Sequence, residues 1–300
     1  METNKKFDVI IVGGSVAGLS AAMTLGRSLR KVLVIDSGKP CNRFTPNSHN
    51  FLTQDGSTPK QILETAKEQI SKYETVEFYD GEVADVVKLD NRFQVKLKAE
   101  NELFESKKII FATGLKDNLP DIKGLKECWG ISAIHCPYCH GYEFKQMKTG
   151  ILANGEAAFH YAKLVSNLTT ELTIFTNGNS EFTDEQLEYL QQKKIQIIEN
   201  EIIEVESENG FIKGISLNDN QFIELNALYL RPNSEQSCKI PESLGCNLNS
   251  HGFIEVEISQ RTNIDGVYAC GDNSNMFRSI ASATAAGNMA GASINLHLQD

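Results

Sequence analysis

The first apolar stretch of the chain runs from Phe7 to Val12 and is interrupted only by Asp8. A short apolar run of this kind is typical of a strand buried on both faces of a parallel sheet. It is followed at once by the glycine-rich turn Gly13 to Gly18 and by a helical run from Leu19 to Arg27. A second strand is predicted from Lys31 to Ile35. This order of strand, turn, helix and strand predicts a doubly wound α/β unit.

The glycine turn has the chemistry of a dinucleotide site. Gly13 permits a tight turn, Gly18 lets helix and strand pack closely, and the helix N-terminus offers N–H groups to a pyrophosphate. Ser15 stands where a second glycine is usual. Asp36 follows the second strand, eighteen residues after Gly18, where its carboxylate can bind a ribose hydroxyl. The alternative is a doubly wound turn that binds no nucleotide.

The next segments alternate between loop, helix and strand patterns. Residues 41–60 are rich in Pro, Asn, Ser and Gly and predict a long loop that lines the cofactor. Residues 115–129 have the composition of a linker. Around them we expect a helix at 59–73, strands at 76–79, 83–89 and 93–97, and a strand at 108–112 closed by Thr113 and Gly114.

The second half repeats this plan on a smaller scale. A strand at 149–152 leads into the turn Ala153 to Ala158 and a helix that ends near Asn167. The last segment then returns to the first plan with a strand that ends in Gly271 and Asp272. The other expected elements are strands at 172–175, 195–204, 211–217 and 252–258, and helices at 183–193 and 280–296. The alanine- and glycine-rich helix at 280–296 could approach a cofactor closely.

Charge and cysteine content narrow the classes of partner. A net charge of −10 argues against nucleic acid and anionic membranes, which reward clustered Lys and Arg. No apolar run approaches the roughly 18 residues that span a bilayer, so we expect a cytoplasmic protein. Seven scattered cysteines do not form the framework of a secreted scaffold. In a reducing compartment, the one close pair is expected to be catalytic.

That close pair lies in the stretch His135 to His140, where Cys136 and Cys139 are each flanked by a histidine. We interpret it as a redox dithiol. Cys-Pro-Tyr-Cys also occurs in glutaredoxins, but a chain of that fold is much shorter. A zinc site is the other alternative, but immediate neighbours rarely converge on one tetrahedral centre, so no metal is predicted. Pro137 suits the first turn of a helix, which would place N–H groups near Cys136.

These motifs together resemble the low-molecular-weight thioredoxin reductase family across essentially the whole chain. The resemblance implies two dinucleotide-binding, Rossmann-like, three-layer α/β domains, an FAD-binding domain at 1–114 plus 246–300 and an inserted domain at 115–245 that carries the CxxC. It implies FAD as cofactor and a homodimer. It also implies that Cys139 faces the flavin while Cys136 exchanges with substrate. The residues expected to bind FAD are Gly13, Ser15, Ala17, Gly18, Asp36, Asn50, Gly114, Gly271, Asp272, Ser279 and Ile280.

The second domain departs from the family pattern. Its turn, Ala153 to Ala158, lacks the first glycine and carries Glu156 where a pyrophosphate would lie. The basic pair that holds the NADPH 2′-phosphate is replaced by Thr176 to Gly178, and no arginine occurs between Arg92 and Arg231. A phosphate needs charge-assisted hydrogen bonds. We therefore predict poor or absent NADPH binding, with NADH less disfavoured, unless a lysine or a loop backbone restores it.

His140 is a second departure, because the reductases carry an aspartate there. The stretch Cys136 to Glu143 is similar to the flavin-dependent dithiol oxidases of gliotoxin and holomycin disulfide formation. This resemblance implies oxidation of a dithiol, with His140 or His135 as the base and oxygen or another acceptor taking the electrons. The expected partner is a small-molecule dithiol or disulfide, or a thioredoxin-like protein. The alternatives are an NADPH-dependent thioredoxin reductase and a flavin-binding redox sensor that acts through a partner.

Overall fold

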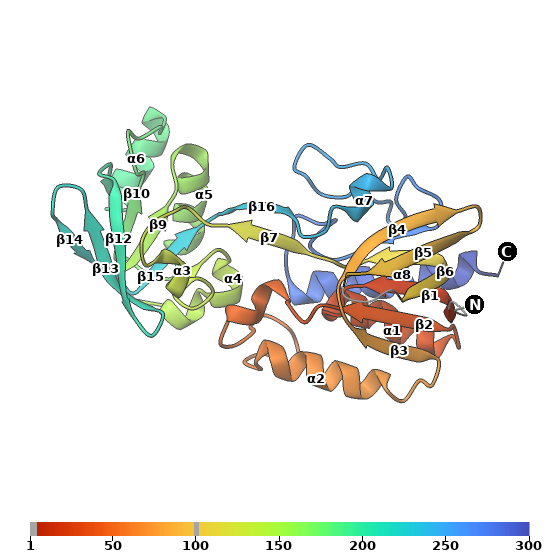
Figure 1. Ribbon diagram of the computed structural model, residues 1–300. Coiled ribbons are helices and arrows are strands. Elements are labelled where there is room, and N and C mark those ends of the chain that lie inside the picture. Colours follow the sequence, from red (N-terminus) through yellow and green to blue (C-terminus); the bar gives the residue numbers. More distant parts are fainter. Residues whose placement is uncertain (1–4, 99–101, 300) are drawn as a thin grey trace. The chain divides into compact units, whose positions relative to one another are not determined.

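The chain divides into two compact units in the computed structural model, which describes residues 5–98 and 102–299 (Figure 1). The first unit comprises Met1–Arg43, Lys60–Lys116 and Ser234–Asp300. The second comprises Phe44–Pro59 and Asp117–Asn233. The α/β fold expected from the sequence is confirmed.

The two units differ from the expected domain ranges at residues 44–59, 115–116 and 234–245. Residues 234–245 belong to the first unit because Ile240 and Leu244 pack against its hydrophobic core. Residues 44–59 belong to the second unit, where Phe44 lies against Gly130 and His49 pairs with Glu143. The short strands β7 (Leu115–Asn118) and β16 (Asn233–Gln236) pair where the chain passes between the units.

The first unit is built on one sheet in which β6 has different neighbours at its two ends. Strands β3, β2, β1 and β6 lie side by side and are parallel, and the carboxyl end of β6 pairs with β17. The amino end of β6 pairs instead with the antiparallel hairpin β4–β5. The elements are β1 (Lys5–Val12), α1 (Val16–Arg27), β2 (Val32–Asp36), η1 (Cys41–Phe44), α2 (Pro59–Ile70), β3 (Val76–Asp80), β4 (Val83–Leu89), β5 (Arg92–Leu97), β6 (Leu103–Phe111), α7 (Ile240–Ser243), β17 (Val267–Ala269) and α8 (Ile280–His297).

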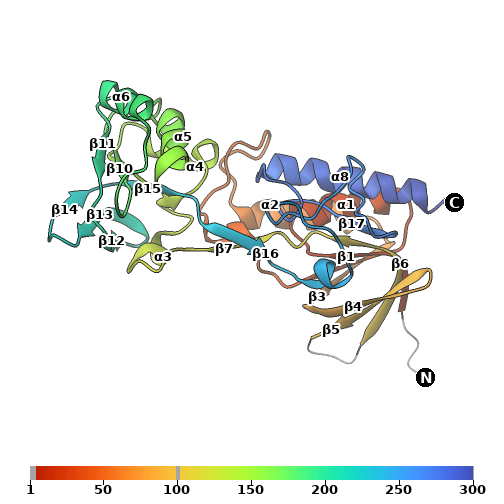
Figure 2. The same cartoon turned by 90° about the horizontal axis from the view of Figure 1, so that it is seen from above.

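The alternation of side chains along β1 creates two cores, one on each face of this sheet. Val9 and Ile11 pack on the face covered by α1 and α8 (Figure 2). Ile10 and Val12 pack on the opposite face, with residues of β4 and β5. All four side chains are buried. This burial on both faces explains why the first strand is a nearly continuous apolar run.

The glycines of α8 let that helix approach α1 rather than a cofactor. A Cβ atom on Gly287 would lie 2.0 Å from the Ala17 carbonyl oxygen, and one on Gly291 would lie 2.9 Å from the Ala21 carbonyl oxygen. The expectation that the bare face of this helix serves a cofactor was therefore wrong for these two glycines. They serve helix packing instead.

The second unit repeats the three-layer plan. A parallel sheet in the order β11-β10-β9-β15-β8 carries α5 on one face and the antiparallel strands β12, β13 and β14 on the other. The elements are α3 (Leu125–Cys128), β8 (Ala133–Ile134), α4 (Pro137–His140), η2 (Tyr142–Phe144), β9 (Thr149–Leu152), α5 (Gly155–Val165), β10 (Leu172–Phe175), α6 (Asp184–Gln192), β11 (Gln196–Ile198), β12 (Ile202–Glu208), β13 (Phe211–Leu217), β14 (Phe222–Glu224) and β15 (Ala227–Leu230).

Three expected elements were wrong. The single strand expected at 195–204 is divided between β11 of the parallel sheet and β12 of the antiparallel sheet. Residues 115–129 are not an unstructured linker, because β7 pairs with β16 and α3 buries Leu125 and Cys128 in the core of the second unit. The expected strand at 252–258 is absent from the described structure. This stretch forms only an isolated bridge between Leu248 and Ile254.

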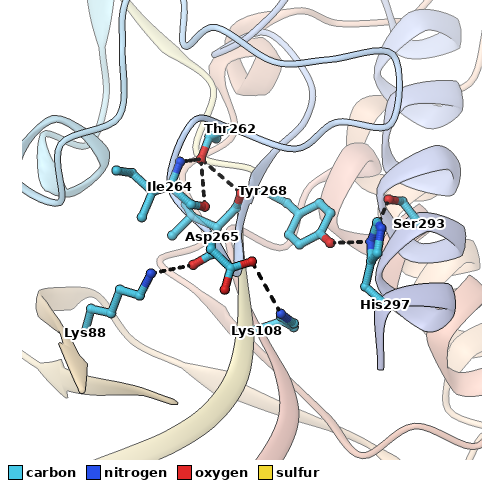
Figure 3. A network of polar contacts seen from close by, with 9 residues as sticks. Lys88, Lys108, Thr262, Ile264, Asp265, Tyr268, Ser293 and His297 are labelled. Atoms are coloured by element: carbon cyan, nitrogen blue, oxygen red, sulfur yellow. Dashed lines mark hydrogen bonds and ion pairs between the residues drawn. The ribbon is translucent and has the colours of Figure 1, made fainter. Parts of the chain in front are cut away.

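A polar network holds the C-terminal segment against the sheet of the first unit (Figure 3). The Tyr268 hydroxyl lies 2.9 Å from Nδ1 of His297, which also faces Ser293. Asp265 lies in the turn that precedes β17, and its carbonyl oxygen accepts a hydrogen bond from Lys88 of β4 at 2.8 Å. The network therefore ties the last turn of α8 to the buried strand β17.

We predict that Tyr268→Phe lowers the free energy of unfolding by about 1 kcal/mol, because it removes the hydroxyl that bonds to His297. Urea unfolding of the purified protein measures this change. Tyr189→Phe is the matched control, since the Tyr189 hydroxyl bonds to no described residue. Equal unfolding midpoints for Tyr268→Phe and the unaltered protein would contradict the prediction.

Candidate active site

The turn after β1 forms a cradle that only glycine permits. Gly13 has a φ of +107°, and a Cβ atom there would lie 2.3 Å from the Ala112 carbonyl oxygen. A Cβ atom on Gly18 would lie 1.9 Å from the Gly13 carbonyl oxygen. These contacts bring the start of α1 tightly against β1 and β6. The two glycines therefore have the roles expected from the sequence.

The N-terminus of α1 is open to an anion. Ser15 is the N-cap residue, but its side chain makes no capping hydrogen bond, and the first turn carries no acidic residue. The backbone N–H groups at the start of this helix, around Val16 and Ala17, are therefore not satisfied by a side chain. A helix end in this state attracts a phosphate through its N–H groups and its dipole.

Asp36 lies at the carboxyl end of β2, beside the same turn. Its Oδ1 accepts a hydrogen bond from the Gly14 N–H at 3.1 Å. A Cβ atom on Gly14 would lie 2.8 Å from the Asp36 Cβ, so the Asp36 side chain packs directly against the Gly14 backbone. The carboxylate is thereby fixed and keeps acceptor capacity for a ribose hydroxyl.

The C-terminal motif reaches the same cradle. A Cβ atom on Gly271 would lie 3.0 Å from the Ala17 Cβ, which places the end of β17 beside the start of α1. The Asp272 Oδ2 lies 3.7 Å from the Cys41 sulfur and 3.5 Å from Nε of Arg278. Ser279 caps α8 and accepts from the Ser282 N–H, and Ile280 begins the helix. Gly271 and Asp272 are thus brought to the glycine turn.

Two other residues expected at the cofactor lie in different surroundings. Gly114 has a φ of +62°, and a Cβ atom there would have nothing within 4 Å. Asn50 belongs to the second unit, where its N–H donates to Oδ1 of Asp55 at 2.8 Å. The sequence offered no signal for this placement, because the loop composition alone does not select a packing partner.

The redox pair is a disulfide within one turn of helix. Cys136 and Cys139 are bonded, with their Cα atoms 5.3 Å apart. Pro137 occupies the first helical position, as expected, and Cys136 is the N-cap. The Cys136 sulfur accepts a hydrogen bond from the Cys139 N–H at 3.2 Å. The same N–H would stabilise a Cys136 thiolate once the disulfide is reduced.

Two buried tyrosines, from α5 and β15, lie against this turn. The Tyr161 hydroxyl, from α5, donates to the His135 carbonyl oxygen at 2.8 Å. A Cβ atom on Gly141 would lie 2.8 Å from the Tyr229 hydroxyl, which comes from β15. Burial raises the pKa of Tyr161 to about 12 and raises that of Tyr229 as well. Both hydroxyls stay protonated at neutral pH, and the Tyr161 hydrogen bond fixes the start of the CxxC turn.

The two flanking histidines differ in their surroundings. Burial lowers the pKa of His140, so its imidazole is neutral at pH 7 and can accept a proton. Glu143 opposes this effect on the His140 pKa and His49 adds to it. The His135 ring lies 6.1 Å from the Trp129 ring. Both histidines stay candidates for the base.

The second glycine turn is closed where the first is open. The Asn154 side chain caps α5, because its Oδ1 accepts from the Gly155 N–H at 2.8 Å and from the Glu181 N–H at 3.0 Å. Glu156 lies in the first turn of the helix, and its Oε2 accepts from the Gln186 side chain at 2.7 Å. The Asn154 and Glu156 side chains at the start of α5 thus bond to groups of the chain itself.

Polar groups of the turn after β10 also form hydrogen bonds with other groups of the chain. Asn177 has a φ of +52°, and its Oδ1 accepts from the Ile202 N–H at 2.8 Å. The Gly178 N–H donates to the Glu199 carbonyl oxygen, and the Ser180 N–H donates to the Glu199 carboxylate. This turn therefore offers a carboxylate where a 2′-phosphate would need a cation.

Residues 7–290 match the family model described as pyridine nucleotide-disulphide oxidoreductase. The chain belongs to this family. It is 30% identical to thioredoxin reductase aclD of Aspergillus oryzae, over 89% of this chain and 88% of that protein. It is similar to the crystal structure of an oxidoreductase from Agrobacterium tumefaciens, with 36% identity, a TM-score of 0.91, and 98% and 99% of the two chains covered. It is also similar to the crystal structure of HlmI, with 31% identity, a TM-score of 0.92, and 100% and 94% covered.

Membership of this family makes the chain a flavin-dependent oxidoreductase, and the cradle of the first unit fits FAD. The open end of α1 would hold the pyrophosphate, Asp36 a ribose, and Asp272 the polar groups near the flavin. FAD would supply a two-electron acceptor. Among residues 5–98 and 102–299, no helix is long and apolar enough to cross a membrane. No group of three His, Cys, Asp or Glu side chains in those ranges is placed to hold a metal.

The five cysteines outside the CxxC turn differ in their burial. Cys128, Cys246 and Cys270 are buried, and burial raises the pKa of each thiol. Cys41 is exposed instead and faces Asp272. The sequence missed this because η1 presents the side chain beside the end of β17, which is distant in the chain.

We predict that Gly13→Ala abolishes FAD retention, because its Cβ would collide with the Ala112 carbonyl in the cradle. FAD per chain, from the absorbance ratio at 450 and 280 nm, measures the effect. Gly178→Ala is the matched control, since it also has a positive φ, +139°, but open space around it. Equal FAD content in the two variants would contradict the assignment of the cradle.

Proposed function

We propose that this protein is an FAD-dependent dithiol oxidase that forms a disulfide in its substrate through Cys136 and Cys139 and uses NADPH poorly or not at all. One observation carries the proposal: the N-termini of the two helices that follow glycine turns differ in capping and in charge. The end of α1 has no side-chain cap and no acid, whereas that of α5 is capped by Asn154 and carries Glu156.

The cost of binding NADPH at α5 supports this direction of electron flow. A charge-assisted hydrogen bond to a phosphate is worth roughly 1.5 to 3 kcal/mol, and a cofactor would have to displace Asn154 to gain such bonds. Glu156 and the Glu199 carboxylate would add like-charge repulsion near the phosphates. The cradle at α1 requires no such displacement. Electrons would therefore enter from a dithiol instead of a nicotinamide.

A dithiol substrate would be oxidised at the CxxC turn by two successive thiol–disulfide exchange steps. One substrate thiol gives its proton to a histidine, and its thiolate attacks Sγ of Cys136. A bond to the substrate sulfur forms, the Cys136–Cys139 bond breaks, and Cys139 leaves as a thiolate. The second substrate thiol is deprotonated and attacks the first substrate sulfur, so the substrate disulfide forms and Cys136 leaves as a thiolate. The Cys139 N–H stabilises that leaving group.

Two electrons and two protons leave the substrate in this sequence. Oxygen or another acceptor would finally take the electrons. The similarity of the CxxC stretch to the flavin-dependent dithiol oxidases supports a small-molecule dithiol as substrate, and the family resemblance supports a homodimer.

The second candidate is an NADPH-dependent thioredoxin reductase. The similarity to thioredoxin reductase aclD of Aspergillus oryzae favours it. It requires that the α5 end release Asn154 and accept a pyrophosphate, and it predicts reduction of a thioredoxin-like protein.

We predict that an anaerobic dithiol bleaches the flavin of the holoprotein at least tenfold faster than NADPH at the same concentration. Stopped-flow absorbance at 450 nm, with dithiothreitol, NADPH and NADH in separate mixes, measures the three rates. Cys136→Ser is the control, and it should abolish reduction by dithiothreitol without loss of FAD. Faster bleaching by NADPH than by dithiothreitol would replace this function by that of a thioredoxin reductase.

We predict that the dithiol reaction keeps its rate down to a pH below the pKa of an exposed histidine. The reason is that burial lowers the pKa of His140, so the neutral base persists as the pH falls and is lost only below that lowered pKa. His140→Gln should slow flavin reduction by roughly 100-fold or more and remove this acid limb. His251→Gln, at an exposed position, is the control. An unchanged profile in His140→Gln would point to His135 as the base.

A further inference from the structure

The turn Gly271 to Ser274 follows β17 and carries Asp272, a candidate FAD-binding residue. Strand β17 ends at Ala269. Gly271 then turns the chain with a φ of +93°, and the Ser274 N–H donates to the Gly271 carbonyl oxygen at 3.1 Å. Asp272 and Asn273 are therefore the two central residues of a closed turn.

The Asn273 side chain ties this turn to the end of β6. Its Nδ2 donates to the Phe111 carbonyl oxygen at 2.8 Å and to the Thr113 hydroxyl at 3.4 Å. The same Phe111 carbonyl oxygen accepts from the Cys270 N–H at 3.1 Å. One carbonyl group of β6 therefore holds the chain on both sides of Asp272.

The backbone of Asn273 is held by a second side-chain amide, that of Gln236 at the end of β16. The Gln236 Nε2 donates to the carbonyl oxygens of Asn273 and Gly252, both at 2.8 Å. The Asn273 carbonyl oxygen also accepts from the Ile254 N–H at 2.9 Å. Gln236 and Ile254 thus both hold the residue that follows Asp272.

Both side-chain amides are buried, and only their N–H groups form hydrogen bonds. Asn273 is 0% exposed and Gln236 is 5% exposed. Neither Oδ1 of Asn273 nor Oε1 of Gln236 has a hydrogen-bond partner among the described residues. A buried acceptor without a donor opposes folding, and an apolar side chain would avoid this cost. The contribution of the two amides is therefore the set of bonds that they donate around Asp272.

The Asp272 carboxylate is also held through its side chain. Its Oδ2 lies 3.5 Å from Nε of Arg278 and 3.7 Å from Sγ of Cys41. The side chain is 18% exposed, so solvent screens these contacts only in part. These two neighbours orient the carboxylate, whereas the amides of Asn273 and Gln236 fix the backbone that carries it.

We propose that Asn273 and Gln236 are positioning residues of the FAD site, which set the place of the Asp272 carboxylate for a hydrogen-bond donor of the cofactor. A carboxylate bonds well to a donor only at the correct distance and direction. Loss of either amide therefore weakens FAD binding through Asp272. This inference rests on the assignment of FAD to the first unit and is independent of the direction of electron flow.

Release of FAD from the holoprotein tests the proposal without any thiol or nicotinamide. Dilution of the holoprotein and the rise in FAD fluorescence give the FAD dissociation constant, which should increase roughly tenfold in Asn273→Leu and in Gln236→Met. Both replacements are close in size to the original side chain and donate no hydrogen bond. Gln236→Met decides the question if Asn273→Leu does not fold.

Gln260→Met is the matched control and should leave the FAD dissociation constant unchanged. Gln260 is also buried in the first unit, and its side-chain amide donates to the Ile258 carbonyl oxygen at 3.3 Å instead of to the turn that carries Asp272.

A double variant separates positioning from a general loss of structure. In the Asp272→Asn background, Gln236→Met should change the FAD dissociation constant less than about twofold, because the carboxylate that it positions is gone. An equally large effect in that background would overturn the proposal, as would equal dissociation constants for Gln236→Met and the unaltered protein. Fast flavin reduction by NADPH would overturn the proposed function but leave these dissociation constants as predicted.

Discussion

The constraint on which this molecule depends is the fate of the unpaired N–H groups at helix starts. Every helix begins with such groups, and they must be satisfied by a side chain, by water or by a ligand. At α1 the chain leaves them open, since Ser15 does not cap and no acid follows. At α5 the Asn154 side chain accepts from the Gly155 N–H, and Glu156 lies in the first turn. One chain thus carries two copies of the same strand–turn–helix plan, and their helix starts differ in side-chain contacts.

The CxxC turn depends on the same kind of interaction, a hydrogen bond to an N–H group at a helix start. Cys136 is the N-cap residue of α4, so the N–H of Cys139 points at its sulfur. The Tyr161 hydroxyl fixes the start of this turn by its hydrogen bond to the His135 carbonyl oxygen, and the Tyr229 hydroxyl lies close to Gly141 at its end. Close to this turn in the chain, the 44–59 segment reaches η2, where Nε2 of His49 lies 3.5 Å from Oε1 of Glu143.

Much of the fold could be predicted because buried parallel strands and glycine turns have local signatures. The run Phe7 to Val12, the cradle glycines and the proline of the CxxC turn behave as their sequence indicates. The errors arose where a segment's partner is distant. Leu115–Asn118 becomes a strand only because Asn233–Gln236 pairs with it, and the glycines of α8 face α1, which lies more than 260 residues earlier.

The sequence by itself therefore determined the α/β class, the glycine cradle with Asp36, and the CxxC pair with its flanking histidines. Each of these is fixed by spacing within one turn or one strand–helix unit, where backbone geometry leaves few choices. The tertiary structure alone decided that Glu156 of α5 bonds to Gln186 of α6, and that His49 lies against Glu143 within the second unit. These are contacts between side chains of separate elements, and their distances depend on packing that no local pattern encodes.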